Sequence, residues 1–91
     1  MKDVKLASGK KAKIVEMSVD SIDYCNDIPI IKYEGKDMII RNLATARTAW
    51  LRNGVDGCDD KFIKSLTEEE KTELSVMIQE YQSLGEGNPS H

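Results

Sequence analysis

The sequence predicts a small single domain of the α+β class, and three observations point to it. In the first half of the chain, two pairs of short segments are rich in alternating or β-branched apolar residues, with a glycine inside each pair. From Asn42 onward, apolar residues recur at three- and four-residue intervals, as they do on helices. With 91 residues, 40% hydrophobic and 32% charged, the chain has the balance of one globular domain. We expect residues 1–85 to form this domain and residues 86–91 to form a flexible tail.

A β-hairpin is expected near the start of the sequence. Residues 4–6 and 12–14 alternate apolar side chains with lysines, so each segment has one apolar face and one solvated face. Ser8 and Gly9 lie between them, and glycine supplies the positive φ that a tight hairpin turn requires. The two segments should therefore pair as antiparallel strands.

Ser18 marks a change from strand to helix. Its hydroxyl can cap a helix, and Met17 and Ile22 have the spacing of a hydrophobic staple across that cap. Pro29 disfavours helical geometry at the residue before it, so the helix should end near Asp27. Its buried face is expected to consist of Val19, Ile22 and Cys25.

A second hairpin is the expected structure of the middle of the chain. Residues 30–33 and 37–40 are rich in β-branched and aromatic side chains, and Gly35 lies between them. The alternative is an extended arm followed by a loop.

Residues 43–53 are expected to form a helix. Asn42 can cap its start, and Gly54 lies where a left-handed C-terminal residue belongs. Three- and four-residue steps place one apolar stripe on it, formed by Leu43, Ala46 and Trp50.

Two further helical segments are expected. Residues 61–66 favour a short turn, and Thr67 with Glu70 forms a capping box at the start of a long helix over residues 68–84. Gly85 should end that helix. Its apolar stripe is expected to consist of Leu74, Met77, Ile78, Tyr81 and Leu84.

Composition and charge narrow the classes of function. The net charge of −3 does not favour nonspecific nucleic-acid binding, and no segment is apolar enough to cross a membrane. The first residues lack the apolar core of a signal peptide, so a cytoplasmic location is expected. Cys25 and Cys58 form no CxxC pair and are expected to be free thiols. A chain of this size buries a modest core, which argues against a deep cleft within one copy.

Metal-binding and catalytic patterns are weak. The acidic loop after Gly54 fails as a calcium-binding EF-hand, because Lys61 and Thr67 stand where that loop needs glycine and glutamate. We expect Asp56, Asp59 and Asp60 to form a polar loop that caps the next helix. His91 is the only histidine, and the neighbouring aspartates should raise the pKa of the Cys58 thiol. We therefore expect a non-enzymatic protein with no cofactor, no metal and no small-molecule substrate.

Apolar helix faces are the candidate protein interface. The alanine-rich segment ATARTAWL and the last helix supply its residues: Trp50, Leu51, Ile78 and Tyr81. The same residues are also the obvious core, and both interpretations remain open at this point. The candidate polar contacts are Arg41, Arg47, Arg52, Glu69, Glu70 and Glu73. The arginines would serve a nucleic-acid-binding accessory protein, and the glutamates would mimic phosphates in an inhibitor.

The opening segment VKLASGKKAKIVEMSVDSID resembles that of the tail assembly chaperones of tailed bacteriophages. The matching positions are Val4, Leu6, Gly9, Ile14, Glu16, Met17, Ser18 and Asp20, within residues 2–28. The resemblance implies a protein-binding factor in virion morphogenesis, in the cytoplasm of the infected host or in the virion. Its partners would be tape-measure or tail-tube proteins, or further copies of itself. The alternatives are a neck, connector or decoration subunit, an acidic inhibitor of a host defence enzyme, and a nucleic-acid-binding accessory protein.

Overall fold

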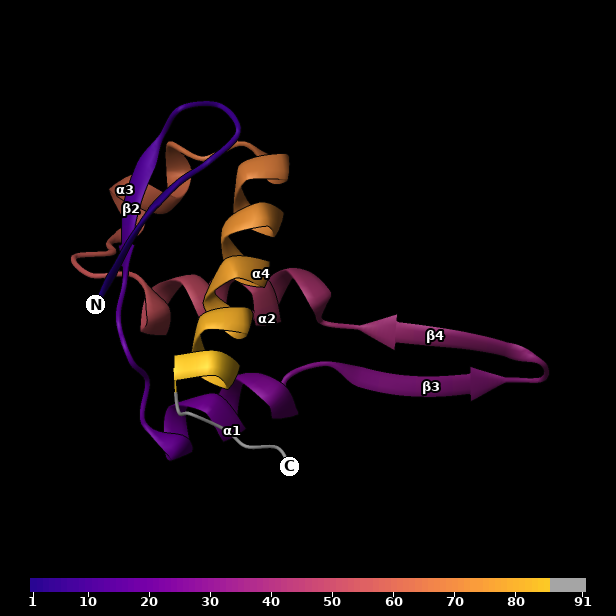
Figure 1. The fold of residues 1–91 in the computed structure, drawn as a ribbon. Helices are drawn as coiled ribbons and strands as arrows, with labels where there is room; N and C mark the ends of the chain where they lie inside the picture. The colour runs from indigo at the N-terminus through magenta and orange to yellow at the C-terminus, as the bar shows by residue number, and fades with distance from the viewer. Residues whose placement is uncertain (86–91) are drawn as a thin grey trace.

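The structure, a computed structural model, describes residues 1–85 and has the expected α+β class (Figure 1). The expected flexible tail, residues 86–91, lies outside the described residues. In chain order the elements are β1 (Lys2–Lys5), β2 (Lys11–Ile14), α1 (Val19–Asp27), β3 (Ile30–Glu34), β4 (Asp37–Arg41), α2 (Leu43–Gly54), α3 (Asp60–Lys64) and α4 (Glu68–Gly85).

The first hairpin is confirmed and forms a sheet of its own. Strands β1 and β2 are antiparallel, with Val4 opposite Ala12, and Gly9 has the positive φ (98°) that its turn requires. Ile14 is fully buried and forms a β-bridge with Val55, just after α2. The hairpin therefore lies against the helices.

Helix α1 begins as the sequence predicts, but it buries a narrower face. The Ser18 hydroxyl accepts a hydrogen bond from the Ser21 N–H at 3.1 Å. Cys25 is fully buried, whereas Val19 is exposed. The prediction for Val19 was wrong because that side chain, in the first turn, faces solvent.

Helix α2 has the expected extent, but the predicted reasons for its two ends were wrong. Asn42 adopts a left-handed backbone (φ 65°), makes no side-chain cap, and donates from Nδ2 to the Ile28 carbonyl at 3.4 Å. Gly54 belongs to the helix and has no positive φ; a Cβ there would overlap the Ile78 side chain of α4. Leu43, predicted to be buried, is exposed.

The predicted caps of α3 and α4 are confirmed. Asp59 accepts a hydrogen bond from the Phe62 N–H at 2.8 Å. In the capping box of α4, the Thr67 N–H donates to Glu70 Oε1 at 2.8 Å, and the Glu70 N–H donates to Thr67 Oγ1 at 3.1 Å. The last stripe residue, Leu84, has a side chain outside the described part.

The hydrophobic core lies where α4 crosses α2, beside the first hairpin (Figure 1). Its largest fully buried side chains are Ile14, Leu51, Leu74, Ile78 and Cys25. Three polar side chains, Glu70, Ser75 and Gln82, are also buried. Gln82 bonds to the backbone between β2 and α1. These hydrogen bonds hold α4 against the segment between β2 and α1.

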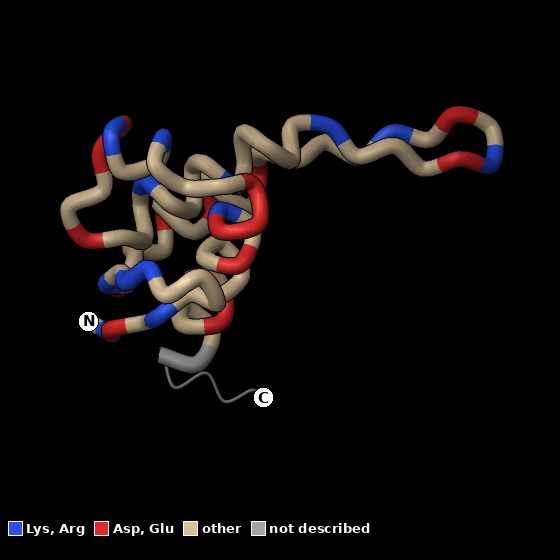
Figure 2. The backbone as a smooth tube through the Cα atoms, turned by 90° about the horizontal axis from the view of Figure 1, so that it is seen from above, with Lys and Arg blue, Asp and Glu red and all other residues tan. Residues whose placement is uncertain are grey.

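The second hairpin, which is confirmed, projects away from the body (Figures 1 and 2). Strands β3 and β4 pair only with each other, in a two-stranded sheet separate from β1–β2. Gly35, with φ 64°, begins the two-residue turn at its tip. We call residues 30–41 the arm and the other described residues, 1–29 and 42–85, the body.

Candidate protein-binding surface

The arm has one apolar face. Residues directly opposite each other in an antiparallel pair point to the same side of the sheet. Ile31 lies opposite Ile40, and Tyr33 lies opposite Met38. All four side chains therefore share one face, and no charge interrupts it.

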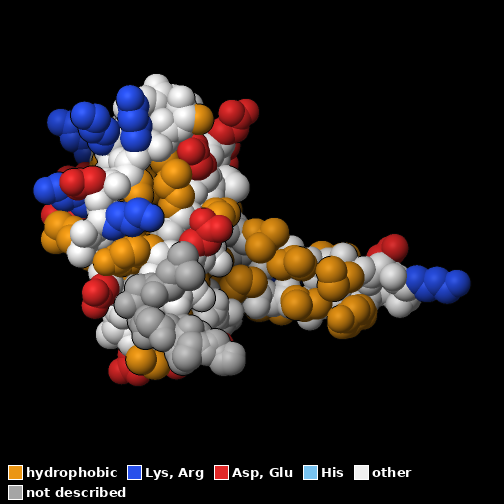
Figure 3. All heavy atoms as spheres, viewed as in Figure 1, with side chains coloured by type: hydrophobic (Ala, Val, Ile, Leu, Met, Phe, Trp, Pro, Cys, Tyr) orange, Lys and Arg blue, Asp and Glu red, His pale blue; other side chains and the backbone are white. Residues whose placement is uncertain are grey.

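This apolar face is exposed to solvent. The exposed fractions are 55% for Ile31, 74% for Tyr33, 56% for Met38 and 39% for Ile40. Figure 3 shows hydrophobic side chains along most of the length of the arm. A contiguous exposed apolar surface on a soluble protein commonly marks an interaction site.

The other face of the arm is mixed, because it carries four charged residues and two isoleucines. Glu34 and Asp37, opposite each other beside the turn, place two acidic groups at the tip. Arg41 lies at the base of β4, and Lys32 lies at the middle of β3. Within residues 1–85, neither Asp37 nor Arg41 has an ion-pair partner.

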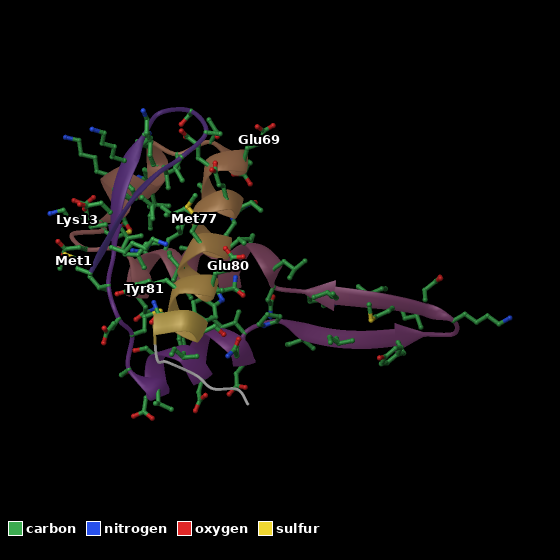
Figure 4. All side chains as sticks on the ribbon, in the orientation of Figure 1. Met1, Lys13, Glu69, Met77, Glu80 and Tyr81 are labelled. Atoms are coloured by element: carbon green, nitrogen blue, oxygen red, sulfur yellow. The ribbon has the colours of Figure 1, made fainter. Side chains whose placement is uncertain are left out.

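Three of the four predicted interface residues belong to the core instead. Trp50, Leu51 and Ile78 are buried where α2 packs on α4, so they present no surface to a partner. Tyr81 is half-buried, and its hydroxyl accepts a hydrogen bond from the N-terminal amine of Met1 at 3.3 Å (Figure 4). A chain this small needs its largest helical side chains to fill its own core.

The predicted arginines do not gather into one basic patch. Arg47 pairs with Glu68 at 2.7 Å, and Arg52 pairs with Asp60 at 2.6 Å. Arg41 lies apart from both, on the arm. The Arg47 hydrogen bond is also the main reason why the pKa of Glu68 is lowered.

The three glutamates of the predicted acidic cluster differ in their contacts: two are hydrogen-bonded to the first hairpin, and the third is exposed to solvent. The Ser8 hydroxyl donates to Glu70, and the Ala7 N–H donates to Glu73 at 3.1 Å. Both glutamates thus hold the turn of the first hairpin. Glu69 points into solvent from the first turn of α4 (Figure 4).

The Glu70 carboxylate is held in its charged form. The hydrogen bond from the Ser8 hydroxyl is the largest cause of its lowered pKa, followed by the hydrogen bond from the Thr67 N–H. The Lys10 ammonium lies 4.0 Å away and acts in the same direction. This carboxylate fastens the first hairpin to the start of α4.

Both cysteines are free and poorly activated. Burial raises the pKa of the Cys25 thiol, and burial is also the main cause of the raised pKa of the Cys58 thiol. The neighbouring aspartates, predicted to raise the Cys58 pKa, do so to a smaller degree, and Arg52 lowers it. In the part of the chain that the structure describes, no three His, Cys, Asp or Glu side chains come together as metal ligands would.

The surface that the structure singles out is therefore the arm, of which only Arg41 was among the predicted site residues. A sequence signal for it exists: Ile31 and Tyr33 in one segment and Met38 and Ile40 in the other fall on one face once the hairpin turn is fixed at Gly35. Among residues 1–85, no helix is long and apolar enough to cross a lipid bilayer. No protein-family model, curated protein or solved structure matches the chain.

Proposed function

We propose that this protein is non-enzymatic and binds another protein chain through the apolar face of the arm. The observation that carries the proposal is the exposure of Ile31, Tyr33, Met38 and Ile40 on one face of a hairpin that projects from a folded body. A two-stranded hairpin is marginally stable in water by itself. A partner that covers this face would bury apolar surface and fix the arm in place.

The dimensions of the face suit an amphipathic helix. Each arm strand has five residues, which corresponds to about 16 Å at the usual rise per strand residue. Three turns of α-helix have about the same length, and one apolar stripe of such a helix would cover the four side chains. Charged groups at the tip and the base would border the partner helix.

The setting we propose is the assembly of a tailed phage, with the protein acting like a tail assembly chaperone. The resemblance of residues 2–28 supports this setting, and the arm supplies a binding element for a segment of a tape-measure protein or for a tail-tube subunit. The body would act as the carrier that keeps the arm soluble. The site of action would be the cytoplasm of the infected cell.

A virion structural subunit is the second candidate, and the shape of the molecule favours it. A projecting arm is suited to reaching a neighbouring subunit in a neck, connector or decoration layer (Figure 2). Mass spectrometry of purified particles separates the two candidates. A fixed, symmetric copy number would support the subunit, and absence from particles despite abundance in infected cells would support the chaperone.

The other two alternatives receive less support. A phosphate-mimicking inhibitor would need free carboxylates, but Glu70 and Glu73 are bonded to the first hairpin. The nucleic-acid-binding alternative loses two of its three predicted arginines, because Arg47 and Arg52 lie in ion pairs. Glu69 is exposed, so its reversal to lysine tests the inhibitor alternative directly. Under the proposed function this reversal should leave partner binding unchanged.

Site-specific photo-crosslinking in infected cells tests the proposal. A benzophenone amino acid would replace Tyr33 on the arm and, as a matched control, Tyr24 on α1, since both tyrosines are exposed. We expect a discrete cross-linked phage protein from position 33 and none from position 24. Equal cross-linking from both positions, or none from position 33, would contradict the role of the arm.

A further inference from the structure

Strand β4 has an unused main-chain edge. In a hairpin with a two-residue turn, the residues beside the turn exchange hydrogen bonds, and this pattern alternates along the strands. Asp37, Ile39 and Arg41 therefore direct their backbone groups toward β3, whereas Met38 and Ile40 direct theirs outward. No strand among the described residues pairs with that outer edge.

The two outer edges of the arm differ in how strongly they resist pairing with a strand of another chain. Lysine in an edge strand disfavours pairing with another chain, and β3 carries Lys32 at its centre. The centre of β4, Met38 to Ile40, carries no charge. Pairing with another strand is therefore open at β4 and hindered at β3.

The sequence of β4 is complementary to itself in the antiparallel direction. If Ile39 of two copies lies on a twofold axis, Met38 of each copy faces Ile40 of the other, and their outward backbone groups can exchange hydrogen bonds. In the same register, Asp37 of each copy faces Arg41 of the other. Opposite charges in directly opposed positions stabilise a sheet.

The isolated arm leaves these charges unsatisfied. Asp37 faces Glu34 across the hairpin, a like-charge pair, and neither Asp37 nor Arg41 has an ion-pair partner within residues 1–85. A second copy would supply both missing partners. The equivalent pairing through β3 would instead place Lys32 opposite Lys32.

We propose that two copies of this chain join their arms along β4, in the register centred on Ile39, to form a four-stranded sheet. This inference rests on the proposed function, because the dimer would double the apolar face that receives the partner chain. The side chains of Met38 and Ile40 from both copies would lie at the middle of that face. The two bodies would lie at opposite ends of the sheet, since the strands run antiparallel.

A charge-swap series tests both the pairing and its register. Sedimentation velocity of the wild-type protein, up to millimolar concentration, should show a reversible monomer–dimer equilibrium. Asp37→Arg and Arg41→Asp should each raise the dimer dissociation constant by roughly tenfold to a hundredfold, because each converts both attractive pairs into repulsive ones. An equimolar mixture of the two variants should form a heterodimer, and the Asp37→Arg/Arg41→Asp double variant should dimerise like the wild type.

Asp23→Arg and Lys11→Asp on the body are the matched controls, because they change the net charge by the same amounts away from the arm. Both should dimerise like the wild type. A monomeric wild type, single variants that dimerise normally, or no recovery in the mixture and the double variant would each overturn the inference. Circular dichroism establishes that every variant is folded.

Failure of the pairing and failure of the proposed function give different results. A monomeric wild type that still cross-links a phage protein from position 33 would overturn the pairing and leave the proposed function intact. A dimer that follows the charge-swap pattern but yields no cross-linked partner would support the pairing and overturn the proposed function.

Discussion

Gln82 of α4 is joined to Met17 by a buried hydrogen bond, in which the Met17 N–H donates to Gln82 Oε1 at 2.9 Å. The other end of the same side chain donates from Nε2 to the Val15 carbonyl at 2.9 Å. One amide group thus satisfies two backbone groups in the segment between β2 and α1. The helix holds this segment as a neighbouring strand would.

We expect Gln82→Leu to lower the free energy of unfolding by about 2 kcal/mol or more, because it leaves two backbone groups without partners. Urea denaturation measures this change. Gln79→Leu is the matched control, because Gln79 is exposed and bonds only to the Ser75 carbonyl of its own helix. Equal effects of the two substitutions would contradict the role given to Gln82.

Gly54→Ala should destabilise the protein by about 1–3 kcal/mol, because the added Cβ would overlap Ile78. In an ordinary helix the same substitution stabilises by about 1 kcal/mol, so the sign of the effect identifies the contact. Combination with Ile78→Ala should cost less than the sum of the two single effects. Strict additivity in thermal unfolding would exclude a direct clash.

Stability should fall in acid partly because of Glu70. The pKa of Glu70 is lower in the folded protein than its ordinary value, so the unfolded chain binds the proton more tightly. This contribution to stability is fully present above the ordinary pKa of 4.5 and is lost as the pH falls through the lower folded value. Glu70→Gln should flatten the pH dependence of urea denaturation in this range. Glu69→Gln, at an exposed neighbouring position, should leave it unchanged.

Cys25 should resist alkylation in the native protein, because its side chain is fully buried and burial raises its pKa. Cys58 is partly exposed and should react first. Mass spectrometry after timed treatment with iodoacetamide measures both rates. Modification of Cys25 at the rate of Cys58 without denaturant would contradict the packing of α1 against α2.

Backbone amides of the arm should exchange with deuterium much faster than those of α2 and α4. The Asp37→Arg variant is used for this measurement, because its arm is expected not to pair with the arm of a second copy. The reason is that β3 and β4 bond only to each other and bury little surface. Hydrogen-exchange mass spectrometry measures the difference. Protection of arm amides equal to that of α4 would mean that the body stabilises the arm directly.

Local signals in the sequence predicted most of the elements. Ser18 and the Thr67–Glu70 capping box act within one helical turn, so their geometry follows from residues that are close in sequence. Both hairpins were predicted from their glycine turns and apolar segments. Gly54 was located correctly at the end of its helix but for the wrong reason, because close packing against α4 depends on a contact that is distant in sequence.

The proposed binding surface was not predictable in the same way. Trp50 and Tyr33 are both large aromatic residues, and the sequence around each fits either a core or an interface. Trp50 is buried because α2 packs on α4, whereas Tyr33 is exposed because of the direction in which the second hairpin leaves the body. The left-handed backbone of Asn42 contributes to that direction, and its conformation was not foreseen.

The hydrogen bond from Asn42 Nδ2 to the Ile28 carbonyl brings the two ends of the arm together at the body. Residues 30–41 thus form an excursion that leaves and returns at nearly one point, while the core side chains lie outside it. Substitutions in the arm can therefore be made without altering the packing that keeps the protein folded. Under the proposed function, the residues that bind a partner and the residues that stabilise the fold would be separate sets, and a different arm sequence could be placed on the same body.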